Sequence, residues 1–329
     1  MKNLFMIQFY QKRDFGQLVS DTFQFFKDHG KNYFKNYLAL NGTLLVLLVA
    51  LYVVGYKSIF AQMFSGNVNG QSYYFEQYFQ ENVGIMVVFG LLFLFLGLAC
   101  IFLIYTFPVL YLKRLAETGD QNISTNQLLG DLKTHLWKFV KFVFGMFFIM
   151  LPITAILMTV SVFLMFIVIG FFLILLLFPT LANIVNFTLF HYFNTNNGFF
   201  ASLRYGFKAQ FSYSNNRLKT PFWKYWASSI VIYLIVQVVS SIILFIPTVI
   251  MGVSVFTVPS DNPHAAMSQF FNGGLGILFF GFYAISILCS FILMNLNSIN
   301  AGLMYYDSRL DLHRNEDFTE IESIGINEI

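Results

Sequence analysis

The chain has 329 residues, of which 57% are hydrophobic and 11% are charged, and its formal net charge is +3. A soluble domain is about 45–50% apolar and about 25% charged, so a water-soluble fold of this length is excluded. The composition predicts an all-α, polytopic membrane protein. It also excludes a nucleic-acid-binding domain, because no basic stripe lies on a soluble segment. Cys100 and Cys289 both lie inside apolar runs, which favours buried thiols over a disulfide framework or a metal site.

Six apolar segments are long enough to cross a bilayer, which needs about 20 mostly apolar residues per helix. In chain order they are residues 38–60, 83–112, 139–165, 168–193, 224–246 and 274–306. The third and fourth come from one stretch, 142–193, which holds no Lys, Arg, Asp or Glu, and we expect it to turn near 166–170. The sequence thus predicts a six-helix domain over 38–306, between an N-terminal segment, 1–37, and an acidic tail, 307–329.

The basic residues predict how the helices are oriented. Of the 19 Lys and Arg residues, 18 lie on one side of the predicted spans, and Lys57 lies on the other. The side with Lys57 also carries Glu76, Glu81 and Asp261. Because cytoplasmic loops of membrane proteins carry an excess of Lys and Arg, we expect both termini to be cytoplasmic.

Each odd-numbered span follows an amphipathic segment, which we expect to form an interfacial helix on the cytoplasmic leaflet. In the first, mostly apolar residues recur at helical spacing: Phe15, Leu18, Val19, Thr22, Phe23 and Phe26. The second, 125–138, follows Ser124 and Gln127, which have the spacing of a capping box. Its expected apolar face consists of Leu128, Leu129, Leu132, Leu136, Phe139 and Val140. The third is 198–211, with Asn197 as the expected N-cap.

Aromatic rings and lysines mark the entry of each amphipathic segment into the membrane, since both residue types favour the headgroup level. The expected interfacial anchors are Phe34, Lys35, Trp137, Lys138, Trp223, Lys224 and Trp226. The pattern has two explanations, a degenerate threefold internal repeat or the ordinary anchors of a polytopic protein.

The predicted spans hold few groups that support chemistry. No Asp, Glu, Lys or Arg lies in the middle of a span, which argues against a proton-driven carrier and an intramembrane aspartyl protease. The histidines are not paired at metal-ligand spacing, so we expect no metal, no cofactor and no catalytic site. Milder polar residues remain as a candidate intramembrane lining: Asn183, Asn186, Gln237, Asn295, Asn297 and Asn300. They either link helices through hydrogen bonds or line a path for a substrate or a lipid headgroup.

Two segments carry a resemblance to a known group of proteins. Residues 13–28 read RDFGQLVSDTFQFFKD, and Tyr305, Tyr306, Asp307, Ser308 and Arg309 precede an acidic segment, 316–324. Together with six helices, these residues resemble uncharacterised six-helix membrane proteins of Bacteroidota type. That family is similar to the membrane domain that accompanies some glycerophosphoryl diester phosphodiesterases. A glycine that such tails often carry is missing between Arg314 and Phe318.

The resemblance implies a bacterial inner-membrane location and an assembly with other subunits, such as a MoxR-type AAA+ ATPase. It does not carry over phosphodiesterase activity, because a (β/α)₈ catalytic barrel needs roughly 250 residues and no soluble stretch here approaches that length. We therefore expect a non-enzymatic membrane subunit that docks partners through its interfacial helices and tail. The expected docking residues are Asp307, Arg309, Asp311 and Glu316. A small-molecule or lipid transporter is the alternative.

Overall fold

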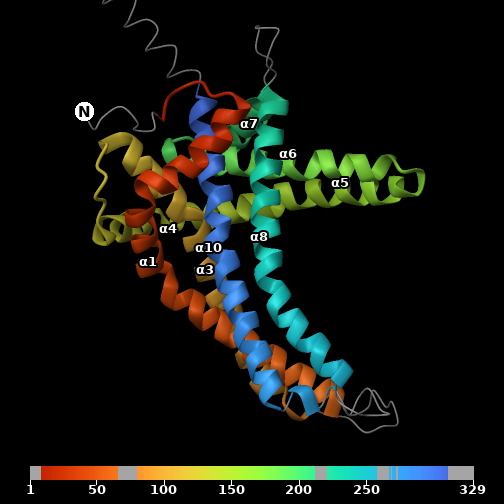
Figure 1. Ribbon diagram of the computed structural model, residues 1–329. Helices are drawn as coiled ribbons and strands as arrows, with labels where there is room; N and C mark the ends of the chain where they lie inside the picture. Colours follow the sequence, from red (N-terminus) through yellow and green to blue (C-terminus); the bar gives the residue numbers. More distant parts are fainter. Residues whose placement is uncertain are drawn as a thin grey trace, which may run out of the picture. The chain divides into compact units, whose positions relative to one another are not determined.

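The computed structural model describes residues 9–65, 80–211, 221–257, 267, 269–271 and 273–309. All regular elements in this part of the chain are helical (Figure 1). They are α1 (Phe15–Ser65), α3 (Val83–Thr118), α4 (Thr125–Gly145), η1 (Met146–Met150), α5 (Leu151–Phe163), η2 (Leu164–Ile167), α6 (Ile169–Asn194), α7 (Phe199–Phe211), α8 (Pro221–Thr257) and α10 (Gly274–Asp307). Six helical stretches are long and apolar enough to cross a membrane. The predicted all-helical, multi-pass class is confirmed, while the orientation stays a prediction.

In two of the six candidate spans the preceding amphipathic segment and the span are continuous. α1 continues through the expected boundary between residues 37 and 38, so the amphipathic segment and the first span form one helix. The second amphipathic segment likewise continues from α4 through η1 into α5. Within η1 the N–H of Leu151 bonds to the carbonyl of Met146, a π-helical step of five residues. This widened turn directly precedes Pro152, which has no N–H to continue the regular α-helical ladder.

The chain divides into two compact units, each described by itself. Unit 1 comprises Met1–Tyr37, Tyr105–Leu234 and Asn295–Ile329, and unit 2 comprises Leu38–Ile104 and Ile235–Met294. The division follows polarity, since unit 1 contains nearly all of the charged residues that the structure describes and unit 2 is almost entirely apolar. The candidate site therefore lies in unit 1.

Aromatic side chains form much of the interior of unit 1. The ring of Tyr33 is fully buried and meets Phe107 and Tyr111 edge to face, at centroid distances of 5.2 and 4.9 Å. Phe25, two turns before Tyr33 on α1, packs against the same ring at 5.7 Å. Edge-to-face pairs of this kind add about 0.5–1.5 kcal/mol beyond the burial of area. They fix the first turns of α1 against the end of α3.

The amphipathic faces differ in part from those predicted. On α1, Leu18 and Thr22 are buried as expected, but Phe15 and Phe23 are exposed and Phe25 is buried in their place. On α4, three residues of the predicted face are buried, namely Leu128, Leu132 and Phe139, whereas Leu129 and Leu136 are exposed. Phe23, Leu129 and Leu136 lie toward the edges of the predicted stripes, and Phe15 lies in the first turn of α1.

α6 and α7 pack closely because glycine lies at their crossing point. A Cβ atom at Gly206 would collide with the Thr188 hydroxyl and would lie 2.7 Å from the Ile184 carbonyl oxygen. Ile184 and Leu203 also belong to an apolar cluster with Met150, which fastens α7 to α6 and to η1. The glycine therefore permits the backbone approach on which this corner of unit 1 depends.

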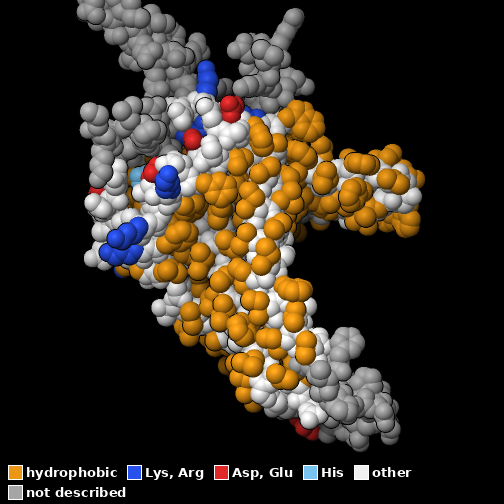
Figure 2. Space-filling model, viewed as in Figure 1, with side chains coloured by type: hydrophobic (Ala, Val, Ile, Leu, Met, Phe, Trp, Pro, Cys, Tyr) orange, Lys and Arg blue, Asp and Glu red, His pale blue; other side chains and the backbone are white. Residues whose placement is uncertain are grey.

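Unit 2 has its own aromatic cluster, formed by Phe270, Phe271, Phe279 and Phe280. Its remaining surface is largely apolar, and in Figure 2 hydrophobic side chains cover the visible face of α8. An apolar surface of this extent is normal for a helix in contact with lipid.

Candidate functional site

Asp307, the last residue of α10, is the centre of a buried polar cluster in unit 1. It is 2% exposed. Its Oδ1 accepts a hydrogen bond of 2.5 Å from the backbone N–H of Arg13. Its Oδ2 accepts bonds of 2.5 Å from the Lys224 ammonium and from the Tyr225 hydroxyl. Lys224 also donates to the Arg13 carbonyl at 2.9 Å, so three segments distant in sequence meet at one carboxylate.

The side chain of Arg13 extends this cluster into the N-terminal segment. Its Nε pairs with Asp21 Oδ2 at 2.9 Å, and its Nη1 donates to the Phe9 carbonyl at 3.0 Å. The start of α1 is capped in addition, because Asp14 and Gln17 exchange side-chain-to-backbone bonds of 2.8 Å in both directions. This D-x-x-Q capping box is readable in the sequence but was missed there.

Asn300, one of the predicted lining residues, joins α10 to two other helices. Its Nδ2 donates to the Thr22 hydroxyl at 3.0 Å, to the Leu18 carbonyl at 3.3 Å and to the Ser228 hydroxyl at 2.9 Å. Ser228 in turn donates to Asn300 Oδ1 at 3.3 Å. The amide is 1% exposed and is used in full by α1 and α8.

The other predicted lining residues differ in burial and in the unit to which they belong. Asn295 is buried and accepts a bond of 2.6 Å from the Tyr33 hydroxyl. Asn186 and Asn297 are half-buried in unit 1, while Gln237 is exposed and belongs to unit 2. The described residues thus support the interhelical role for Asn295 and Asn300.

Asn183 differs from the other asparagines because part of its amide is unused. Its Oδ1 accepts a bond of 2.5 Å from the Ser229 hydroxyl, but its buried Nδ2 has no hydrogen-bond partner among the described residues. The same holds for both polar atoms of Gln210 on α7 and for the indole Nε1 of Trp226 on α8. Unsatisfied buried donors cost about 1–3 kcal/mol each, so these groups call for an explanation.

A second polar network fixes the start of α4. The carbonyl of Ile123 accepts from Asn36 Nδ2 at 2.9 Å and from Asn32 Nδ2 at 3.1 Å, and the Thr125 hydroxyl donates to Asn36 Oδ1 at 2.6 Å. Tyr111 donates to Asn32 Oδ1 at 2.9 Å, which brings α3 into the network. The predicted capping box of Ser124 and Gln127 is confirmed directly beside it. The role of the two asparagines could not be seen in the sequence, since their partners lie 79 to 91 residues away.

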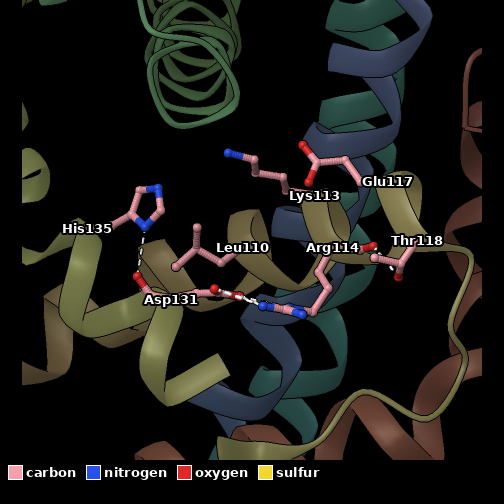
Figure 3. A pocket seen from close by; sticks show the side chains of 7 residues that line it. All are labelled: Leu110, Lys113, Arg114, Glu117, Thr118, Asp131 and His135. Atoms are coloured by element: carbon pink, nitrogen blue, oxygen red, sulfur yellow. Dashed lines mark hydrogen bonds and ion pairs between the residues drawn. The ribbon is translucent and has the colours of Figure 1, made fainter. Parts of the chain in front are cut away.

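An open pocket of about 200 Å³ lies between α3 and α4 (Figure 3). It is lined by Leu110, Lys113, Arg114, Glu117, Thr118, Asp131 and His135. Arg114 and Asp131 form a two-pronged pair across it, with Nε–Oδ2 and Nη2–Oδ1 distances of 2.8 and 2.9 Å. His135 Nδ1 lies 2.7 Å from the carbonyl oxygen of Asp131, one turn earlier on α4.

Two further charges at this pocket have opposite signs. Lys113 donates to the Phe193 carbonyl at 3.2 Å, and Figure 3 shows its side chain on the same side of the pocket as Glu117, apart from the Arg114 pair. The Thr118 hydroxyl donates a hydrogen bond of 2.8 Å to the Arg114 carbonyl. The lining therefore suits the binding of a small polar or zwitterionic group, and it contains no activated nucleophile.

The predicted interfacial anchors fall into two groups. Lys35, Trp137 and Trp223 are exposed, whereas Phe34, Lys138, Lys224 and Trp226 are half-buried. Two of the lysines are used inside unit 1, since Lys138 donates to the Thr195 carbonyl at 2.8 Å and Lys224 pairs with Asp307. The expected role of Lys224 as a headgroup anchor stays a prediction; in the structure its ammonium pairs with a buried carboxylate.

The predicted docking residues are only partly described. Asp307 is 2% exposed and accepts three hydrogen bonds, and its expected role in docking a partner stays a prediction. Arg309 is half-buried and its Nη1 donates to the Tyr305 hydroxyl at 2.7 Å. Asp311 and Glu316 lie outside the described residues. Within the described ranges, no group of three or more His, Cys, Asp or Glu residues could hold a metal ion.

Comparison of the chain with protein-family models, with curated proteins and with solved structures finds no match. The resemblance to the membrane domain of glycerophosphoryl diester phosphodiesterases therefore stays a prediction.

Proposed function

We propose that the protein is a non-enzymatic membrane subunit of a multi-protein assembly, and that it docks its partners on the exposed faces of α1, α4 and α7. The observation that supports this proposal most directly is the pair of buried networks around Asp307 and Asn36. They join the start of α1 to α8 and α10, and the start of α4 to α1 and α3. Segments held in one arrangement form a preorganised surface, which lowers the entropic cost of binding a partner.

Exposed basic residues give this surface its chemistry. On α1 they recur every four residues, at Lys27, Lys31 and Lys35, and therefore lie along one face of the helix. α7 repeats the spacing with Arg204 and Lys208, both exposed. A partner with an acidic surface would be complementary to these stripes, and such complementarity favours correct and fast association.

Purification from the native host in a mild detergent, followed by mass spectrometry, tests the proposal. The informative variant is the double substitution Lys27→Glu and Lys31→Glu, and its matched control replaces both lysines by arginine. Since like charges brought together in an interface cost several kcal/mol, we expect recovery of the partner to fall at least about tenfold in the glutamate variant. The arginine control should retain the partner, and the thermal stability of both should equal that of the wild type.

The acidic tail offers a second variant, Asp311→Lys with Glu316→Lys, because Asp307 is buried and its substitution would disturb the fold. An ATPase of the MoxR type among the recovered proteins would also support the relationship that the resemblance implies. Unchanged recovery of every partner in both charge-reversed variants would contradict the docking role.

A transporter or lipid-binding protein is the alternative, and one observation favours it. Asn183 Nδ2, Gln210 and Trp226 Nε1 offer buried polar groups on α6, α7 and α8 without partners among the described residues. A bound polar molecule would satisfy them. Native mass spectrometry of the purified protein tests this: a defined lipid or metabolite should be lost in Asn183→Leu and in Gln210→Met. An empty wild-type protein would count against the alternative.

A further inference from the structure

The connection between α5 and α6 is a tight turn without any polar side chain. α5 ends at Phe163, η2 and Val168 follow, and α6 begins at Ile169 (Figure 1). From residue 162 to residue 179, which includes the whole turn, every side chain is apolar or absent. The two flanking polar residues, Ser161 and Thr180, donate their hydroxyls to backbone carbonyls four residues earlier in their own helices.

The side chains of the turn point outward. Phe166 is 89% exposed, Phe163 69%, and Phe172 and Val168 64% each. In Figure 2 hydrophobic side chains cover the visible face of this hairpin as far as its end. Leaving a large apolar side chain in water instead of an apolar environment costs about 1.5–3 kcal/mol, so several such side chains at one turn indicate a medium other than water.

Three backbone N–H groups of the turn are hydrogen-bonded within the hairpin. The N–H of Leu164 bonds to the carbonyls of Val160 and Val162, and the N–H of Val168 bonds to the Met165 carbonyl at 3.0 Å. In the first turn of α6 the N–H of Phe171 donates to the Val168 carbonyl at 3.2 Å. Internal satisfaction is the condition under which backbone can lie in hydrocarbon.

The residue types at two positions of the turn agree with this condition. Val168 has a φ of 66°, in the left-handed region where Gly or Asn is normally found. Asn would be the natural choice in water, but its amide would be unsatisfied in hydrocarbon. Gly170 has to be glycine, because a Cβ atom there would collide with the Ser161 carbonyl and the Met165 amide.

The predicted connections between the other pairs of spans have a different composition. Residues 61–82 include Glu76 and Glu81 and several Asn and Gln residues, and residues 247–273 include Asp261 and His264. Chain that leaves the far side of a bilayer meets water and carries such groups. The turn near Phe166 carries none.

We propose that the α5–α6 hairpin turns round within the bilayer, so that its turn contacts lipid acyl chains and exposes no loop on the far side. The length of the helices agrees with this. From residue 142, the first after Lys141, to residue 163 the chain rises about 33 Å at 1.5 Å per residue. The hydrocarbon core is about 30 Å thick, so a hairpin tilted by more than about 25° keeps the end of α5 inside it.

Single-cysteine labelling of the full-length protein in intact cells tests the proposal. The background carries Cys100→Ala and Cys289→Ala, and Phe166→Cys is the test position because its exposed side chain makes the substitution mild. Ser72→Cys, in a predicted far-side loop, is the positive control for a membrane-impermeant maleimide. Since reagent and water are excluded from hydrocarbon, Phe166→Cys should react at least about tenfold more slowly than Ser72→Cys. It should react readily after unfolding in SDS.

A spin label on the same Phe166→Cys variant, reconstituted in liposomes, identifies what surrounds the turn. If acyl chains surround the turn, molecular oxygen should relax the label efficiently and a water-soluble nickel chelate should not. Labelling in cells as fast as at position 72 would overturn the proposal. Protection from both oxygen and nickel would overturn it as well, because it would mean that protein, from a second copy or a partner, covers the turn.

Discussion

The Nζ atom of Lys224, at the start of α8, lies 2.5 Å from Oδ2 of Asp307, the last residue of α10. The two residues are separated by 83 positions in the chain, and their side chains are 17% and 1% exposed. The same carboxylate receives the N–H of Arg13 and the hydroxyl of Tyr225. A buried ion pair of this kind holds helices in register, because either charge alone would be left without compensation.

Removing this carboxylate should destabilise unit 1 strongly. Asp307→Ala leaves the Lys224 ammonium without its counter-charge, and breaking a buried pair from one side typically costs 3–5 kcal/mol. We expect a clear fall in the thermal midpoint of the detergent-purified protein. The control is Glu117→Ala, an exposed acid at the pocket, which should change the midpoint little.

A double-mutant cycle shows that the two charges act on one another. Lys224→Met combined with Asp307→Ala should cost less than the sum of the single substitutions, since the double variant buries no lone charge. Additive losses would show that Asp307 acts mainly through Arg13 and Tyr225.

The six apolar helices could be predicted from the sequence because a bilayer imposes the same length and apolarity on every span. The function of Asp307 could not, because nothing local shows that a carboxylate beside a predicted membrane boundary is buried. Its burial depends on Arg13, 294 residues away, and on Lys224. The sequence placed Asp307 on a docking surface for the same reason that it placed Lys224 among lipid headgroups: each charge was considered without its partner.

Periodicity alone also left the detail of α1 unresolved. Helical spacing placed Leu18, Thr22 and Phe23 on one face, but it did not include Phe25, which lies beyond the opposite edge of the stripe from Phe23. The structure buries Phe25 because Tyr33 and Tyr111 provide edge-to-face contacts for its ring. Those contacts come in part from α3, so only the tertiary fold decides between the two phenylalanines.

The crossing of α6 and α7 should not tolerate a side chain at Gly206. Gly206→Ala places a methyl group against the Thr188 hydroxyl and the Ile184 carbonyl, and the backbone that would have to move belongs to a packed helix. We expect a loss of about 1–3 kcal/mol, as for other overpacked sites, measured as a lower thermal midpoint.

The matched control for this substitution is Gly130→Ala on α4. A Cβ atom there meets nothing within 4 Å, and the position is exposed in the interior of a helix. The alanine should stabilise the helix by roughly 0.5–1 kcal/mol. An equal effect of the two alanines would mean that α6 and α7 do not approach as closely as the structure has them.

Asn300 and Asn297 separate a structural role of the asparagines from a transport role. Asn300→Leu removes the bonds to Leu18, Thr22 and Ser228, and the loss of buried bonds with their partners left behind should cost about 1–3 kcal/mol. Asn297→Leu, at a half-buried position one turn earlier, should cost little. If Asn297→Leu instead abolished binding or flux of a small molecule while leaving the thermal midpoint unchanged, the asparagines would be a lining and the transporter alternative would gain.

Substitution of Val168 distinguishes a turn in hydrocarbon from a turn in water. Val168→Gly removes a β-branched residue from the left-handed region, where its strain is about 1–2 kcal/mol. The entropic cost of glycine offsets part of this gain, so the substitution should raise the thermal midpoint in lipid nanodiscs slightly. Val168→Asn relieves the same strain but adds an amide. In hydrocarbon that amide lacks partners and should offset the gain, so we expect the thermal midpoint to be highest for glycine, lower for valine and lowest for asparagine.

A turn in water would instead accept asparagine as well as glycine, because asparagine tolerates the left-handed region and its amide would be hydrated. Equal stabilisation by both substitutions in nanodiscs would therefore place the turn outside the hydrocarbon, whatever the labelling at position 166 shows.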